Sequence, residues 1–227
     1  MKISGDIDAV DGEDYKVNIT LPEIRYDLSE FLIHKSDGVI FLYKPPLMHT
    51  ERQTPLDSLC LDDLLKGDLL EYRLISRLDY GVDGVVAALH KGVNAEYEQK
   101  NYYAWVKGDF PNEYSGNWSI DADKRRKVAV KETKNGGKID FRSLKRSNGY
   151  TLLEVILASA ERHKVRAVCA HIGYPIAGDP LYGNNDEWDS EELTLKLRQR
   201  IGLHCCKAAV NGIGAVSPYK DSFEVLY

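Results

Sequence analysis

The sequence predicts an α+β fold in which strands outnumber a few short helices. Strand patterns recur along the chain, as an apolar run at residues 39–43, another at 85–89, and alternating patterns at 100–108 and 150–157. Helical spacing of apolar residues is confined to shorter stretches, of which residues 163–172 are the clearest. A chain of 227 residues is long enough to bury a sizeable core.

The composition indicates a globular protein without a membrane span. Hydrophobic residues make up 43% and charged residues 29% of the chain, which is ordinary for a globular domain. The apolar run at 85–89 is far too short to cross a bilayer, and the first residues lack the apolar core of a signal peptide. We therefore expect a cytoplasmic protein. Its four cysteines contain no C-x-x-C pair, so we expect reduced thiols and neither a disulfide framework nor a structural zinc site.

The charge of the chain is unevenly distributed. The net charge is -5, but residues 124–147 contain ten basic and two acidic residues and carry +8. The rest of the chain therefore carries -13. A concentrated basic stretch can engage phosphates even in a mildly acidic protein. A solvated surface loop explains the same pattern, and charge alone does not decide between the two.

The first third of the chain is expected to contain short elements. Residues 1–30 begin with an acidic, turn-rich segment and include a short alternating strand at 17–21. Residues 39–43 have the pattern of a buried strand, which the following Lys-Pro-Pro ends. Residues 55–65 carry leucines at spacings nearer three and four than two, which predicts a short helix.

A strand followed by a tight turn is predicted around Asp79. Residues 70–76 alternate as one strand face, and Gly81 and Gly84 allow a reversal before the next apolar run. Asp79 would then lie where a strand meets a loop, where a carboxylate can face a cleft. Asp is also common in turns for reasons of backbone hydrogen bonding, and residues 76–84 alone favour that simpler explanation.

Two strands and one helix are expected in the second half of the chain. The strand at 100–108 has Tyr102 on one face and Trp105 on the other, so periodicity does not decide which face meets a core. Residues 150–157 form a further central strand. Leucines and an isoleucine four apart predict an amphipathic helix at 188–201.

The helix predicted at residues 163–172 has apolar residues at i, i+3, i+4 and i+7, and Gly173 supplies its end. Arg166 lies on another face of this helix and could project towards a carboxylate such as Asp79 as a fixed counter-ion. Asp179 lies in a Gly-Asp-Pro turn, for which we expect a structural role.

Together these segments resemble the RluA-like pseudouridine synthases over residues 31–227. Four blocks occur in the order of that family, and the last is long enough to be specific. The blocks are Lys44-Pro45-Pro46 with Met48-His49, Arg77-Leu78-Asp79 with Gly84, Lys100-x-Tyr102-x-Ala104-x-Val106-x-Gly108, and His163-Lys164-Val165-Arg166 continuing into residues 171–183.

The resemblance implies a fold and an activity. The fold would be a mixed, largely antiparallel sheet with a central active-site cleft and flanking short helices. Residues 31–227 would form the catalytic domain, while residues 1–30 leave no room for the small N-terminal RNA-binding domain of the family. The protein would be a monomeric isomerase that converts a uridine of structured RNA, rRNA or tRNA, to pseudouridine after extruding the base from its stack. It would need no cofactor and no metal.

The resemblance also implies roles for individual residues. Asp79 would be catalytic, Tyr102 would pack on the target base, and Arg166 would keep the carboxylate ionised. Arg77 would help to fill the gap left by the extruded nucleotide, and His163 and Lys164 would contact the substrate. The basic residues expected to contact the RNA backbone are Lys124, Arg125, Arg126 and Lys127.

Several positions depart from the family pattern and define the alternatives. Asp83 stands in the family's Thr-Ser-Gly, and if it faced Asp79, one of the two carboxyls should have a raised pKa. Glu161 and Lys164 replace the usual Arg and Gln around the histidine. These departures favour a catalytically inactive RNA-binding protein, whereas retention of the catalytic residues favours the isomerase. A third class is a sugar hydrolase that uses Asp79 and Asp83 as acid and base.

Overall fold

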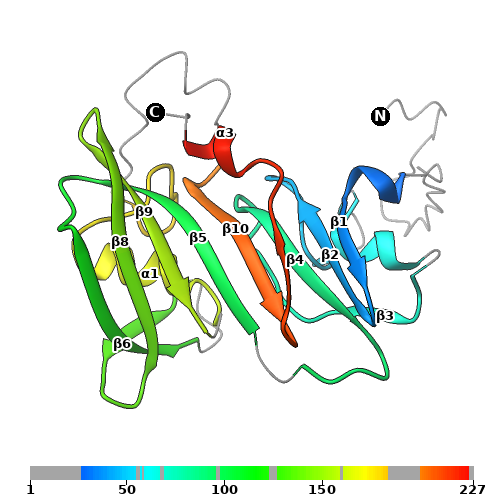
Figure 1. The fold of residues 1–227 in the computed structure, drawn as a ribbon. Helices are drawn as coiled ribbons and strands as arrows, with labels where there is room; N and C mark the ends of the chain where they lie inside the picture. Colours follow the sequence, from blue (N-terminus) through cyan, green and yellow to red (C-terminus); the bar gives the residue numbers. More distant parts are fainter. Residues whose placement is uncertain are drawn as a thin grey trace, which may run out of the picture.

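The computed structural model describes residues 27–54, 57, 59–66, 69–95, 98–122, 127–158, 161–183 and 200–224. Within these residues, eleven strands form one sheet in the order β1-β2-β4-β10-β5-β9-β8-β6-β7, with β11 paired to β10 and β3 to β4 (Figure 1). Among the described strands, β4 and β10 pair in parallel and the other neighbours pair antiparallel. The predicted mixed, largely antiparallel sheet is confirmed.

The elements have the following bounds. The strands are β1 (Leu32–Ser36), β2 (Val39–Lys44), β3 (Tyr72–Leu74), β4 (Asp83–His90), β5 (Glu98–Lys107), β6 (Glu113–Asp121), β7 (Ala129–Glu132), β8 (Gly137–Ser147), β9 (Tyr150–Leu157), β10 (Leu203–Val210) and β11 (Ile213–Val216). The helices are the 3-10 helices η1 (Leu28–Glu30) and η2 (Leu61–Lys66) and the α-helices α1 (Lys164–His171) and α3 (Lys220–Glu224).

The two faces of β5 are both buried, which explains why an aromatic occurs on each. Tyr102 belongs to the large core cluster, which also contains Val165 and Val168 of α1. Trp105 belongs to a smaller cluster with Phe223 of α3. Because neighbouring side chains of a strand point to opposite faces, α1 and α3 cover opposite faces of the sheet at β5.

The predicted central elements are confirmed at β2, β4, β5, β9 and α1. The helix α1 ends as expected, with Gly173 at φ +90°, in the left-handed region that favours glycine. Gly84 is required for a different reason, because a Cβ at this position would lie 2.3 Å from the carbonyl oxygen of Cys205. Glycine thus lets β4 start directly beside β10, and this brings the segment before β4 close to the centre of the sheet.

Two predicted elements are wrong in extent. The strand predicted at residues 70–76 is reduced to β3, and the chain from 75 to 82 is irregular. The helix predicted at 55–65 is reduced to η2. Before η2, the Asp57 carboxylate accepts hydrogen bonds from the backbone amides of Gln53 and Thr54, at 2.6 and 3.0 Å, and residues 55, 56 and 58 lie outside the described residues.

The described part of the basic segment contains the strands β7 and β8 and the short connection between them. Strand β6 lies between β7 and β8, and the chain crosses β6 at Trp118, which pairs with the last residue of β7 and the first residue of β8. At this crossing a Cβ on Gly136 would lie 2.4 Å from the carbonyl carbon of Trp118, which explains a glycine there. Strands β6, β10 and β11 had no counterpart among the predicted elements.

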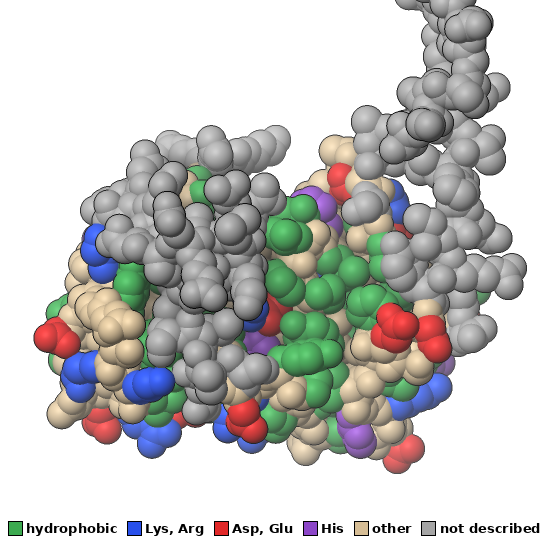
Figure 2. Space-filling view, turned by 90° about the horizontal axis from the view of Figure 1, so that it is seen from above, with side chains coloured by type: hydrophobic (Ala, Val, Ile, Leu, Met, Phe, Trp, Pro, Cys, Tyr) green, Lys and Arg blue, Asp and Glu red, His purple; other side chains and the backbone are tan. Residues whose placement is uncertain are grey.

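Other expectations concern the surface and the ends of the chain. No helix in the described ranges is long and apolar enough to cross a membrane. All four cysteines are free and buried. The strand predicted at 17–21 and most of the helix predicted at 188–201 lie outside the described residues. Figure 2 shows that hydrophobic side chains gather on one face of the molecule, with acidic, basic and histidine side chains around them.

Candidate functional site

The loop that carries Asp79 is anchored on both sides of this residue. The Thr50 hydroxyl donates to the carbonyl oxygen of Leu78 at 2.7 Å and accepts from its amide at 3.1 Å. Beyond Asp79, the Ile201 amide donates to the carbonyl oxygen of Gly81 at 2.9 Å. The Asp79 side chain keeps 27% of its surface exposed, so Thr50 and Ile201 hold the backbone of the loop while the carboxylate reaches solvent.

Arg166 connects two carboxylates. It projects from α1 and donates from Nη1 to Oδ2 of Asp79 at 2.6 Å. Its Nε and Nη2 donate to the two carboxylate oxygens of Asp179, each at 2.8 Å. Such a two-pronged contact fixes the plane of a guanidinium, so Asp179 orients Arg166 towards Asp79. The structural role of Asp179 is therefore to orient Arg166, a partner that the composition of the turn did not indicate.

The charges of Arg166 and Asp179 are mutually stabilised. Burial disfavours the charged form of Asp179, but hydrogen bonds and charge from Arg166 outweigh it and lower the pKa of this carboxyl. Burial likewise opposes the charge of Arg166, but its bonds to Asp179 and the nearby Asp79 raise its pKa. Both groups are therefore ionised at neutral pH, and Asp79 always has a cation beside it.

His163 lies on the other side of Asp79. It precedes α1 with φ +57°, and its Nε2 is 3.5 Å from Oδ1 of Asp79. Its Nδ1 is 3.0 Å from the Tyr182 hydroxyl, which accepts a hydrogen bond from the Val128 amide. Burial lowers the pKa of His163, so the ring is neutral at pH 7.

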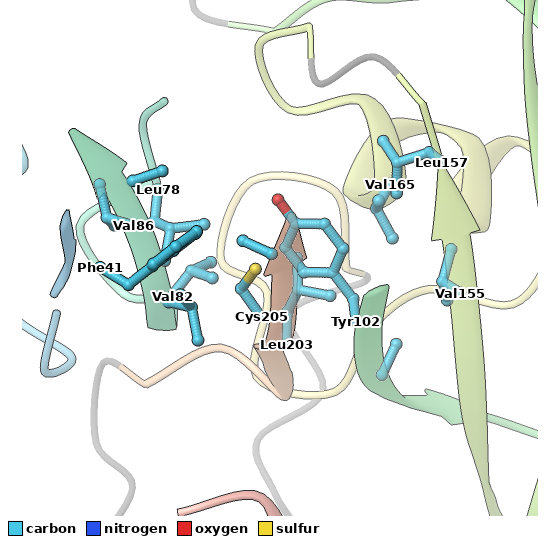
Figure 3. Close-up of a cluster of buried hydrophobic side chains, with 14 of the residues drawn as sticks. Phe41, Leu78, Val82, Val86, Tyr102, Val155, Leu157, Val165, Leu203 and Cys205 are labelled. Atoms are coloured by element: carbon cyan, nitrogen blue, oxygen red, sulfur yellow. The ribbon is translucent and has the colours of Figure 1, made fainter. Parts of the chain in front are cut away.

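The three residues Asp79, Tyr102 and Arg166 line one cleft, with a volume of about 910 Å³. Figure 3 shows the Tyr102 ring between Leu78 and Val82 on one side and Leu157 and Val165 on the other. Leu157 also lines the cleft. Tyr102 is 5% exposed, so its ring is held by packing and presents a small part of its surface to the cleft.

The remaining predicted site residues lie at different depths. Arg77 lines the cleft with 62% of its side chain exposed and pairs with Glu51 at 2.9 Å. Lys164 also lines the cleft, but 1% of its side chain is exposed and its ammonium contacts Glu161 at 2.5 Å. Glu161 and Lys164, two of the departures from the family pattern, thus neutralise each other's charge.

The basic residues predicted to contact the RNA backbone are described only in part. Lys124, Arg125 and Arg126 lie outside the described residues. The ammonium of Lys127 lies 5.9 Å from the centre of the Tyr182 ring, which also contacts His163. The described end of the basic segment is therefore adjacent to the site.

Asp83 belongs to a separate buried cluster. It accepts hydrogen bonds from the Tyr43 hydroxyl at 3.1 Å, from Arg200 at 3.0 Å and from His204 at 2.9 Å. Burial disfavours its charge, but the bond and charge of His204 and the charge of Arg200 lower its pKa. Asp83 is fully buried and does not line the cleft, which excludes the acid–base pair that a sugar hydrolase would need.

No group of three or more His, Cys, Asp or Glu side chains in the described part of the chain could hold a metal ion. The contacts of the candidate site are instead ion pairs and hydrogen bonds between side chains.

Lys44 is a fully buried cation next to the site. Its ammonium donates to the carbonyl oxygens of Pro45 at 2.9 Å and Met48 at 2.8 Å. Burial lowers its pKa from 10.5 to about 7, although the charges of Asp83 and Asp79 act in the opposite direction. Lys44 thus holds the segment after β2 in place at the cost of a weakened charge.

Lys44→Met should change the pH dependence of stability. Between about pH 7 and 10.5 the unfolded chain binds the Lys44 proton more tightly than the native chain. The free energy of unfolding should therefore rise with pH in the wild type, by up to about 1.4 kcal/mol per unit from this group. The free energies of unfolding of the wild type and of Lys44→Met should be measured with urea from pH 7.5 to 9.5 in roughly half-unit steps. As the pH rises, the wild type should gain stability relative to the variant. The exposed Lys131→Met is the control, and a constant difference for Lys44→Met would contradict the assignment.

The chain is similar in sequence to several pseudouridine synthases. It is 31% identical over 132 residues to an RNA pseudouridine synthase of Chloroflexus aurantiacus, a match that covers 53% of this chain and 42% of that protein. It is 26% identical over 194 residues to ribosomal large subunit pseudouridine synthase D of Xanthomonas campestris, which covers 76% of this chain and 58% of the relative. The chain thus spans less than two thirds of the length of either relative. No model of a protein family matches the chain.

The fold is similar to that of two human structures. RNA pseudouridylate synthase domain containing 4 matches with a TM-score of 0.63 and 17% identity, covering 88% of this chain and 92% of that one. RNA pseudouridylate synthase domain containing 1 matches with a TM-score of 0.63 and 13% identity, covering 89% and 90%. Together with the sequence relatives, these matches confirm the resemblance: the chain is similar in sequence to pseudouridine synthases and has the fold of these two structures.

Proposed function

We propose that this protein is an RNA pseudouridine synthase and that residues 31–227 form its catalytic unit. The observation that carries the proposal is the position of Asp79, which is partly exposed in a cleft and paired with a buried arginine that a second carboxylate orients. The reaction is an isomerisation, in which the bond from ribose C1′ to uracil N1 breaks and a bond from C1′ to C5 forms, while C5 loses its proton and N1 gains one. It needs no co-reactant, and an ionised carboxylate in a fixed orientation suits it.

The roles of the site residues follow from this geometry. A base in structured RNA must leave its stack before an enzyme can act on it, and the cleft of about 910 Å³ has room for a nucleotide. Asp79 is the group that acts on the extruded nucleotide, with Arg166 keeping it ionised. Tyr102 supplies a rigid aromatic surface for the base, and His163 and Lys164 contact the substrate from the start of α1.

The RNA is rRNA or tRNA. The Xanthomonas relative is named for the large ribosomal subunit, so we propose rRNA as the first substrate to test and tRNA as the second. Arg77 has a long, exposed side chain at the cleft and is suited to fill the gap left by the flipped nucleotide. We further propose that the protein acts as a monomer in the cytoplasm.

A comparison of cellular RNA tests this function. Pseudouridine should be mapped in rRNA and tRNA from a strain that lacks the gene, from the parent strain, and from the deletion strain carrying either the wild-type or the Asp79→Asn gene. One or more pseudouridines should disappear in the deletion strain and return with the wild-type gene alone. If every pseudouridine persists while the protein co-purifies with RNA, the protein is instead a catalytically inactive RNA-binding protein on the same fold.

Replacement of Lys124, Arg125, Arg126 and Lys127 by Ser should weaken the salt dependence of RNA binding. Each phosphate that a basic residue neutralises contributes roughly 0.7 to the logarithmic slope of affinity against salt, so loss of these contacts flattens the slope. The Michaelis constant should rise, while turnover at saturating RNA should change little because the groups around Asp79 are intact.

The matched control for this variant replaces four exposed lysines elsewhere by Ser, namely Lys35, Lys66, Lys91 and Lys207. It changes the net charge by the same amount and should leave the slope closer to that of the wild type. An unchanged slope in the first variant would identify the basic segment as a surface without RNA contacts. A lost turnover with unchanged affinity would place it in the active site.

A further inference from the structure

We propose that Tyr80 and His49 form a stacking site for a second, unpaired nucleobase at the mouth of the cleft. The inference rests on the proposed function, because it assigns to the same cleft a contact with a nucleotide that neighbours the target uridine. It predicts that the substrate presents at least two unstacked bases, as in an RNA loop or bulge and not in an uninterrupted helix.

The two side chains form an aromatic pair beside Asp79. Tyr80 follows Asp79 directly, and both Tyr80 and His49 line the cleft. Their ring centres are 4.6 Å apart, with the ring planes inclined by 37°. Tyr80 is 43% exposed, whereas Tyr102 in the same cleft is 5% exposed. The cleft therefore has one aromatic that is packed in the core and another that offers much of its surface to a ligand.

The backbone beneath this pair is fixed. The Leu47 amide donates to the carbonyl oxygen of Tyr80 at 2.8 Å, which ties the segment after β2 to the catalytic loop. Leu47 has φ +63°, a conformation that costs energy for a residue with a side chain and that its neighbours must maintain. The buried Lys44 binds the carbonyl oxygens on either side of Leu47, at Pro45 and Met48. An aromatic held in this way binds a base without first being ordered.

The surroundings have the charge that a nucleotide requires. The exposed Arg162 lines the same cleft, and so does Arg77, whose ion pair with Glu51 a phosphate would replace. Cations beside an exposed aromatic ring are the combination that binds single-stranded nucleic acid, with the base stacked on the ring and the phosphate on the cation. Leu47, which is 39% exposed and bonded to the backbone of Tyr80, extends the apolar surface. A phosphate alone would use the cations and leave the aromatic pair without a function, so a base fits the site better.

Binding of two RNA probes tests the proposal. The first probe is a fluorescein-labelled uridine 12-mer, and the second has the same number of phosphates but abasic riboses in place of the nucleotides. Tyr80→Ser should weaken binding of the first probe roughly 5-fold to 150-fold, the range that base–aromatic stacking supplies. It should leave binding of the abasic probe unchanged, and Tyr80→Phe should bind both probes like the wild type.

Tyr219→Ser is the matched control, because Tyr219 is 49% exposed and does not line the cleft. It should bind both probes like the wild type. An equal loss with both probes, or no loss in Tyr80→Ser, would overturn the stacking site. Mapping of pseudouridine in cells that carry the wild-type gene separates this result from the proposed function. Absence of pseudouridine with wild-type protein refutes the isomerase, while a base-specific effect of Tyr80→Ser on binding would still support the stacking site.

Discussion

The Asp79→Asn variant is expected to form no measurable pseudouridine and to bind RNA like the wild type. The change removes the charge and nearly preserves the shape of the side chain. Arg166 remains bonded to Asp179 through Nε and Nη2, so its orientation does not depend on Asp79. The amide cannot act as the carboxylate that the isomerisation needs, and we expect a loss of turnover of at least about ten-thousandfold, the upper end of what a positioned acid or base contributes.

The measurement is pseudouridine formed per enzyme in a single turnover, together with RNA affinity by fluorescence polarisation. The matched control is Asp37→Asn in the turn between β1 and β2, which changes an exposed carboxylate outside both the cleft and the basic segment. Its activity and affinity should both be those of the wild type. If Asp79→Asn retained the activity of the wild type, the catalytic role of Asp79 would be refuted. If it lost affinity and activity in proportion, Asp79 would contribute to binding alone.

The free energy of unfolding of the Asp83→Ala variant is expected to be about 3–5 kcal/mol lower than that of the wild type. The carboxylate of Asp83 is fully buried and accepts hydrogen bonds from Arg200, His204 and Tyr43. Its removal leaves the guanidinium, the hydroxyl and the fully buried His204 ring without this acceptor. The desolvation cost of the remaining groups then persists without compensation.

Urea unfolding at pH 7 measures this effect, with Asp140→Ala as the exposed control, for which we expect a change below about 1 kcal/mol. The pH dependence provides a second check. The pKa of Asp83 is lowered from 3.8 in the native state, so its contribution is present above that value and is lost as the pH falls through the native pKa. The difference between wild type and Asp83→Ala should therefore shrink in strong acid. A difference that is small at pH 7 would show that the cluster adds little stability.

Sequence patterns alone identified the elements in which the spacing of apolar residues shows which side chains are buried. Strands β2 and β9 are continuous apolar or alternating runs, and α1 has apolar residues at helical spacing with a glycine at its end. Such patterns follow from burial of one face or both, and this requirement acts on each short segment separately. The order of the four sequence blocks likewise indicated the family and the residues Asp79, Tyr102 and Arg166 before their positions were known.

Tertiary structure decided what depends on partners distant in the chain. Strand β6 consists mostly of polar residues, so its sequence does not predict a strand. It is a strand because β7 and β8 pair with its two edges. The fork from Arg166 to Asp179 and the burial of Asp83 under Arg200 and His204 join residues from separate elements. A carboxylate in a turn has the same local sequence whether it is solvated, catalytic or buried. Its charge state and its role are set by the cations that folding brings to it, and these are not its neighbours in sequence.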